Sequence, residues 1–202
     1  MPRKGVDRSR ITAAAAEIAD ERGLQAVTLQ AIASILNVKS PSLYSHVENL
    51  DDVHRELALL GLSVLTERLT QASIGKSGLE LLRSVCLAQM TMALERPGLY
   101  AASVAANRPG DDELNQRWQG PVNIFTAVID SYGISGDEAS HAMRVLRTSV
   151  HGFALVNSIR GFRLGVDPDE TFERLVGSLH CSLSEWDRVA AVSSTADIAT
   201  KA

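Results

Sequence analysis

The chain has 202 residues, of which 45% are hydrophobic and 22% charged, an ordinary composition for a globular protein with room for a sizeable core. Its net charge of −4 by itself argues against a nucleic-acid partner. That charge is unevenly distributed along the chain, because residues 1–50 carry a net charge of +1 and residues 51–202 carry −5. The first ten residues hold most of that positive charge, on Arg3, Lys4, Arg8 and Arg10. Such a basic arm is typical of a phosphate contact, and a solvated, disordered terminus is the alternative.

The sequence lacks the patterns of a membrane, metal or catalytic protein. No apolar stretch reaches the roughly 20 residues of a membrane span, and the N-terminal arginines lead into no signal-peptide core. The five histidines show no HxxxH or HExxH spacing, and GxSxG, P-loop and GxGxxG motifs are missing. Cys86 and Cys181 are far apart and are expected to be buried, reduced thiols. We therefore expect a cytoplasmic protein with no cofactor, no metal and no enzymatic activity.

Apolar residues recur at helical spacing along nearly the whole chain, which predicts an all-α fold of about nine helices. Asp7, Thr28 and Asn49 are expected to begin helices, and Gly23 is expected to end the first one. Asp167 followed by Pro168 marks the start of the last helix. The expected helices cover residues 8–22, 28–36, 40–47, 49–74, 79–96, 99–106, 111–133, 137–160 and 168–189. Residues 193–202 are expected to be a frayed tail.

Two short helices joined by a tight turn, within residues 29–47, predict a helix-turn-helix. Ala33 is small where the two helices must approach closely. Asn37 stands where the turn needs a left-handed residue, a conformation that asparagine adopts more readily than most residues. Five apolar residues are expected to point inward: Ile32, Leu36, Val38, Leu43 and Val47.

The outward face of this motif is short, polar and rich in hydrogen-bond donors. Lys39, Ser40 and Ser42 are placed to reach base edges in the major groove. Tyr44 and His46 are placed to bind phosphate oxygens and so fix the register on DNA. Taken singly, an exposed tyrosine or histidine is more often simple surface covering.

The sequence LNVKSPSLYSHVENLDDV, at residues 36–53, resembles the signature of the TetR family of transcriptional repressors. The resemblance implies that the DNA-reading helix carries Lys39, Ser40, Pro41, Ser42, Tyr44 and His46. It further implies that Gln30 touches DNA from the preceding helix and that Thr28 caps that helix beside a phosphate. Arg3 and Lys4 are expected to contact DNA from the arm.

Two positions depart from the family pattern. Leu50 stands where many members have a lysine at the start of the fourth helix, so a phosphate contact is expected to be missing there. Glu48 adds a negative charge nearby. The basic arm, including Arg8 and Arg10, is expected to compensate for both.

The C-terminal part, around VHGFALVNSIRGF, resembles the WHG subtype of the family, with Val150 in place of its tryptophan. The resemblance implies a DNA-binding domain over residues 1–50 and a helical ligand-binding and dimerisation domain over residues 51–192. Candidate pocket residues, for which ordinary core packing is the alternative, are Cys86, Met90, Leu94, Trp118, Phe125 and His151. The predicted homodimer interface uses two apolar helices, through Val156, Ile159, Leu175, Leu179 and Leu183.

These features together predict a ligand-responsive repressor. It would bind a palindromic operator on double-stranded DNA as a homodimer and be released by a small hydrophobic effector. A small all-helical enzyme and a ligand-independent architectural DNA-binding protein are the alternatives. A change in DNA affinity on adding hydrophobic ligands separates the three.

Overall fold

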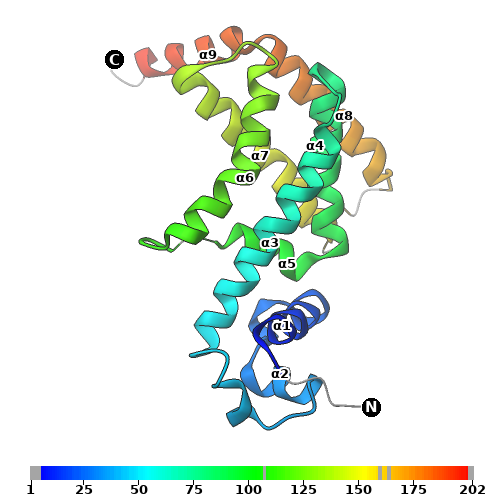
Figure 1. Ribbon diagram of the computed structural model, residues 1–202. Coiled ribbons are helices and arrows are strands. Elements are labelled where there is room, and N and C mark those ends of the chain that lie inside the picture. Colours follow the sequence, from blue (N-terminus) through cyan, green and yellow to red (C-terminus); the bar gives the residue numbers. More distant parts are fainter. Residues whose placement is uncertain (1–5, 107, 159–160, 163–164, 200–202) are drawn as a thin grey trace. The chain divides into compact units, whose positions relative to one another are not determined.

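The computed structural model describes the backbone of residues 6–106, 108–158, 161–162 and 165–199, and every regular element within these ranges is a helix (Figure 1). The all-α prediction is therefore confirmed. The α-helices are α1 (Arg8–Arg22), α2 (Leu29–Ile35), α3 (Leu50–Ser73), α4 (Gly78–Glu95), α5 (Pro97–Val104), α6 (Asp112–Asp130), α7 (Gly136–Ser158), α8 (Pro168–Ser184) and α9 (Trp186–Ala199). Two short 3₁₀ helices are η1 (Leu24–Ala26) and η2 (Ser40–Leu43).

The chain divides into two compact units. Unit 1 combines Met1–Glu67 with Met92–Pro121, and unit 2 combines Arg68–Thr91 with Val122–Ala202. All three crossings between the units fall inside helices, in α3, α4 and α6. The helix-turn-helix therefore shares a unit with α5 and with the first parts of α3 and α6. These two units are defined by contacts between residues. The domain boundary expected after residue 50 was based instead on the helix-turn-helix motif and on the family resemblance.

The core of unit 1 begins with α1, whose ends are formed as the sequence predicts. The Asp7 side chain accepts a hydrogen bond from the backbone N–H of Arg10 at 2.9 Å, and Gly23 ends the helix with φ +85°. The buried side chains of α1 are small or β-branched, which allows neighbouring helices to approach closely. They are Ile11, Thr12, Ala14, Ala15, Ala16, Ile18 and Ala19.

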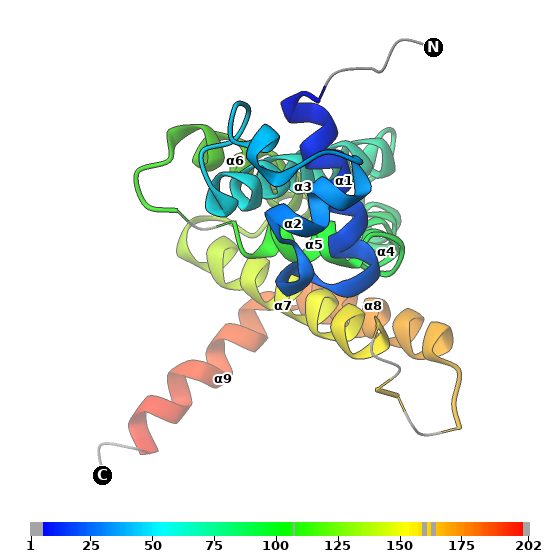
Figure 2. The same ribbon diagram turned by 90° about the horizontal axis from the view of Figure 1, so that it is seen from below.

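Helix α5 packs against α1 within unit 1, and both views show the two side by side (Figure 2). The residue that precedes α5, Arg96, gives no side-chain hydrogen bond that caps the first backbone N–H groups of the helix. The carboxylate of Asp20, on α1, takes that role: it accepts from the Leu99 N–H at 3.0 Å and from Arg96 Nε at 2.5 Å. Gly98 lets the two backbones meet at this point, because a Cβ there would lie 2.1 Å from the carbonyl carbon of Ala19.

Unit 2 has its own core, in which aromatic rings join α7 to α8. The ring centroid of Phe153 lies 5.4 Å from that of Phe172 and 4.9 Å from that of Phe162. Arg83 on α4 forms a two-bond ion pair with Glu173 on α8, at 2.5 and 2.9 Å. These contacts bring α4, α7 and α8 together.

The C-terminal end differs from the prediction in two respects. The expected helix over residues 168–189 begins as predicted, with Asp167 as cap and Pro168 in the first turn, but it ends at Ser184. Trp186 is buried and its Nε1–H donates to Glu138 on α7 at 2.7 Å, which redirects the chain, so α9 departs from the axis of α8 (Figure 2). The backbone then stays helical to Ala199, beyond residue 193 where fraying was expected.

Within the described ranges, none of the helices combines the length and the apolar character that crossing a membrane requires.

Candidate nucleic-acid interface

Helix α2 begins the candidate DNA-reading surface. Thr28 is its N-cap, as predicted, and its hydroxyl oxygen accepts a hydrogen bond from the Ala31 N–H at 3.1 Å. Ile32 and Ala33 are buried, whereas Gln30 is exposed on the opposite face. The helix is therefore fixed by its inner face, and Thr28 and Gln30 both remain open to a ligand as large as DNA.

The turn after α2 has the geometry that the sequence predicts. Asn37 has φ +53°, and no other non-glycine residue in the described part of the chain has a positive φ. The Val38 N–H donates to the Ala33 carbonyl at 3.0 Å and the Asn37 N–H donates to the Ser34 carbonyl at 3.1 Å. This pair of bonds is a Schellman motif, which closes the helix and fixes the direction of the next segment.

The reading segment itself is shorter than predicted. A helix was expected over residues 40–47, but the structure has the 3₁₀ helix η2 at Ser40–Leu43, followed by hydrogen-bonded turns. Pro41 lies in the first turn, where its missing N–H costs nothing. The N–H groups of His46 and Val47 both bond to the carbonyl of Leu43, at 2.9 and 3.0 Å. Leu43 and Val47 are buried, so the core holds this segment although it is not a regular α-helix.

Polar side chains cover the outer surface of the turn and of η2. Tyr44 leaves 59% of its surface exposed, and Ser40 is half-buried. The other predicted DNA contacts are exposed, namely Thr28, Gln30, Lys39, Pro41, Ser42 and His46. The two predicted contacts of the arm, Arg3 and Lys4, lie outside the described residues. Of the inward set, Ile32, Leu43 and Val47 are buried, whereas Leu36 and Val38 are half-buried.

The start of α3, directly after this surface, is acidic and is paired with arginines from distant parts of unit 1. Arg8 forms an ion pair with Asp52 and a longer one, 3.5 Å, with Glu56. Arg108 Nη2 donates to Asp51 Oδ1 at 2.5 Å. The expectation that Arg8 compensates for the missing lysine at position 50 stays a prediction, and in this structure Arg8 is paired with carboxylates of α3.

Arg55 joins α3 to the start of α6. It donates from Nε to one carboxylate oxygen of Asp111 at 2.5 Å and from Nη2 to the other at 2.9 Å, and it also contacts Glu113 at 2.8 Å. This hydrogen bond from Arg55 lowers the pKa of Asp111 to about 2. The start of α3, next to the reading segment, is thus bonded to the residues that begin α6.

The six predicted pocket residues are divided between the two units. Leu94 and Trp118 belong to unit 1, whereas the remaining four belong to unit 2. Leu94 is 40% exposed and Trp118 is 37% exposed. Cys86, Met90 and Phe125 are buried, His151 is half-buried, and burial raises the pKa of the Cys86 thiol to about 12. Cys181 is exposed, which corrects the expectation of two buried thiols.

The predicted dimer residues are also divided. Leu179 and Leu183 are buried in the core of unit 2, so they offer little surface to a second chain. Leu175 is half-buried, Val156 is 36% exposed, and Ile159 lies outside the described residues. Helix α7 nevertheless has two apolar faces, as predicted. One is buried, through Leu146, Val150 and Phe153, and the other is exposed, through Val145, Leu155 and Val156.

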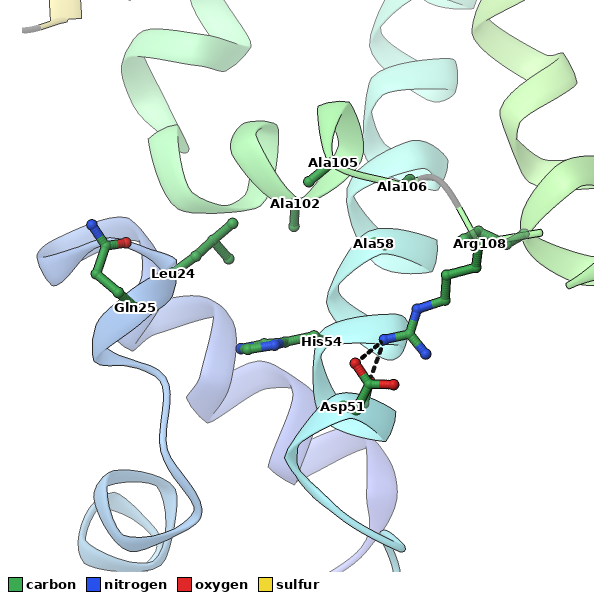
Figure 3. Close-up of a pocket in the computed structure, with 10 residues that line it drawn as sticks. Leu24, Gln25, Asp51, His54, Ala58, Ala102, Ala105, Ala106 and Arg108 are labelled. Carbon is green, nitrogen blue, oxygen red and sulfur yellow. Dashed lines mark hydrogen bonds and ion pairs between the residues drawn. The ribbon is translucent and has the colours of Figure 1, made fainter.

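A pocket of about 420 Å³ within unit 1 was missed by sequence reasoning (Figure 3). Its walls come from segments that are distant in sequence, at η1, α3, α5 and the start of α6. They are Leu24, Gln25, Asp51, His54, Ala58, Ala102, Ala105, Ala106, Arg108 and Leu114. Alanines carry no pattern that marks a cavity, so only the fold reveals it.

Comparison with known proteins matches two segments of the chain to models of one family. Residues 11–49 match the family model described as bacterial regulatory proteins of the tetR family. Residues 82–179 match the model described as the tetracyclin repressor-like C-terminal domain. The two models together take in the reading surface and most of unit 2.

Two sequence relatives cover most of the chain. The uncharacterized HTH-type transcriptional regulator YobS of Bacillus subtilis is 32% identical over 162 residues, which cover 80% of this chain and 84% of the relative. An uncharacterized HTH-type transcriptional regulator of Mycobacterium tuberculosis is 28% identical over 172 residues, 85% of this chain and 78% of the relative.

Solved structures show the same fold. A protein of unknown function from Rhodococcus sp. superposes with a TM-score of 0.75 at 19% identity, covering 90% of this chain and 97% of that one. A TetR variant from Acinetobacter baumannii in complex with minocycline gives 0.64 at 22% identity, covering 92% and 98%. ActR of Streptomyces coelicolor in complex with (S)-DNPA gives 0.61 at 22%, covering 89% and 98%. From its motif, its fold and these relatives, the chain belongs to the TetR family of DNA-binding, helix-turn-helix transcriptional regulators.

Proposed function

We propose that this protein is a ligand-responsive repressor that binds a palindromic operator as a homodimer. The observation that carries the proposal is the exposed polar surface of η2, held on a buried base by the Schellman turn at Asn37. Ser40 and Ser42 read base edges, and Tyr44 and His46 bind phosphates on either side. Thr28, Gln30 and Lys39 extend the same surface, and Arg3 and Lys4 add phosphate contacts from the arm.

The dimer is supported by the apolar surface that one chain leaves uncovered. Val145, Leu155 and Val156 are exposed on the outer face of α7, a position that costs free energy in water unless another surface covers it. A two-fold pair of such faces suits a palindromic site, because each reading surface then meets one half-site. Residues 51–192 serve dimerisation and ligand binding in this proposal, and residues 1–50 serve DNA binding.

Ligand response is supported by the named complexes of structural neighbours, since a TetR variant holds minocycline and ActR holds (S)-DNPA. A small hydrophobic effector releases this protein from DNA if it binds the DNA-free form more tightly, because equal affinity for both forms shifts no equilibrium. Helix α3 contributes residues to both units, so it is the natural route from an effector to the reading surface. We propose no enzymatic role for the chain.

The decisive experiment is selection of bound sequences from random double-stranded DNA, with sedimentation of the free protein in parallel. We expect an inverted repeat whose half-site centres lie about one helical turn apart, roughly 34 Å, and a dimer at micromolar concentration. Val156→Glu is expected to produce monomers and to abolish operator binding, whereas Val192→Glu is the control on another exposed valine. A wild-type monomer that binds an inverted repeat tightly would contradict the proposal.

A further inference from the structure

The pocket of unit 1 has an apolar part and a polar edge. Its apolar part is made of small side chains, four alanines and two leucines. Figure 3 shows Leu24 and Ala102 on one side of the space and the His54 ring reaching toward it from α3. A volume of about 420 Å³ is within the range of natural small-molecule sites and well above the space that one water needs.

His54 lines this pocket, and its ring carries a buried polar atom. Its Nε2 has no hydrogen-bond partner in the described part of the chain, although the atom is shielded from solvent. Burying a polar nitrogen without a partner is unfavourable, so such atoms are rare in folded proteins and a bound molecule is one way to satisfy them. A neutral imidazole nitrogen either donates or accepts, and a hydroxyl group matches both cases.

The charged groups at the pocket edge leave little net charge for a ligand to neutralise. Arg108 donates to both the backbone carbonyl and the carboxylate of Asp51, at 2.8 and 2.5 Å. A charged ligand in the apolar part would lack a counter-charge, because the two charges at the edge already pair with each other. A neutral ligand keeps the pair intact.

We propose that this pocket binds a neutral molecule of one or two rings, whose hydroxyl group hydrogen-bonds to His54 Nε2 and whose rings pack against the alanines. The site lies wholly within unit 1 and is distinct from the six pocket residues expected from the sequence.

Binding here has a consequence for DNA, which rests on the proposed function. The pocket wall includes η1, the link between α1 and α2, and the first turns of α3, directly after the reading segment. A ring packed among Leu24, His54 and Ala102 therefore fixes the helix-turn-helix relative to α5. The bound molecule changes operator affinity by favouring one position of these elements.

The binding test uses 2-naphthol and naphthalene as matched probes with the full-length protein in the absence of DNA. We expect 2-naphthol to shift the imidazole NMR signals of His54 and to bind more tightly than naphthalene. His54→Phe keeps a ring of similar size but removes the nitrogen, so it should lower the affinity for 2-naphthol about fivefold and leave that for naphthalene unchanged. Loss of the hydroxyl preference is a readout that a purely structural role of His54 would not produce.

A second pair of variants tests where the rings lie. Ala105→Leu fills the pocket from an exposed position and should weaken 2-naphthol binding about tenfold or more. Ala101→Leu is the matched control, one turn earlier on α5, exposed and outside the pocket wall. Absence of any His54 shift at millimolar 2-naphthol, or equal weakening by both leucines, would overturn the pocket. Binding at His54 without any change in operator affinity would leave the site standing and remove its regulatory role.

Discussion

Replacing Gly98 with alanine tests how closely α5 must approach α1. The added Cβ would lie 2.1 Å from the carbonyl carbon of Ala19, 2.2 Å from its oxygen and 2.5 Å from the Asp20 nitrogen. These are backbone atoms, which cannot move aside like the end of a flexible side chain. Because carbon atoms pack at about 3.5 Å or more, the two helices must separate by roughly 1.4 Å.

The free-energy cost follows from what that separation breaks. Forcing an extra methyl group into a packed contact costs about 1–3 kcal/mol. The Asp20 carboxylate would also lose its 3.0 Å bond from the Leu99 N–H, a hydrogen bond to a charged group worth about 1.5–3 kcal/mol. Replacing glycine returns about 0.5–1 kcal/mol by restricting the unfolded chain. We expect a net destabilisation of about 3 kcal/mol, a large part of the stability of an ordinary domain.

Urea unfolding followed by circular dichroism measures this change. Gly98→Ala should lower the unfolding midpoint with little change in slope. Gly177→Ala on α8 is the control, because a Cβ at that helical position meets no atom within 4 Å outside its own helix backbone, and it should leave the midpoint unchanged or raise it slightly. Equal midpoints for Gly98→Ala and the wild type would show that α5 does not depend on this close backbone contact.

Three further predictions concern the reading surface and the titrating groups. Tyr44→Phe should weaken binding to all DNA sequences alike, by about 1 kcal/mol, whereas Ser42→Ala should change base preference; the reverse pattern in a binding assay would exchange their roles. Cys181 should react with a thiol reagent in the folded protein and Cys86 should not, because burial raises the pKa of Cys86 to about 12; two fast thiols would contradict this. The bond from Arg55 lowers the pKa of Asp111 to about 2, so its stabilising contribution is complete above the ordinary value of 3.8 and is lost as pH falls through about 2. In Arg55→Met, an NMR titration should find the Asp111 pKa nearer 3.8.

Local features of the fold were predictable because they depend on neighbouring residues. The caps at Asp7 and Thr28 and the left-handed turn at Asn37 each follow from side-chain chemistry at one position. The two faces of α7 follow from its hydrophobic period, since Leu146 and Val150 fall on the buried side and Leu155 on the exposed side.

Features that depend on distant contacts were not predictable in this way. Pairing of Asp20 with Leu99 joins positions 79 residues apart, and no local pattern announces it. The burial of Leu179 and the exposure of Leu94 depend on which neighbour covers each side chain, whereas periodicity identifies only an apolar face. The early end of α8 depends on a hydrogen bond between Trp186 and Glu138 on another helix.

The arginine–carboxylate pairs of unit 1 orient its helix-turn-helix more than they stabilise it. The three arginines are partly exposed, with 44% of the side chain exposed for Arg8, 31% for Arg108 and 23% for Arg55, and ion pairs in such positions contribute little each. The positions of these arginines matter more than the strength of their ion pairs. Arg8 and Arg108 contact carboxylates in the first turn of α3, and Arg55 itself lies in its second turn. Each bond has a short reach and a fixed direction, so together they hold the start of α3 relative to α1 and to the segment that begins α6. A displacement of that segment therefore reaches the residues next to η2 without passing through the apolar core.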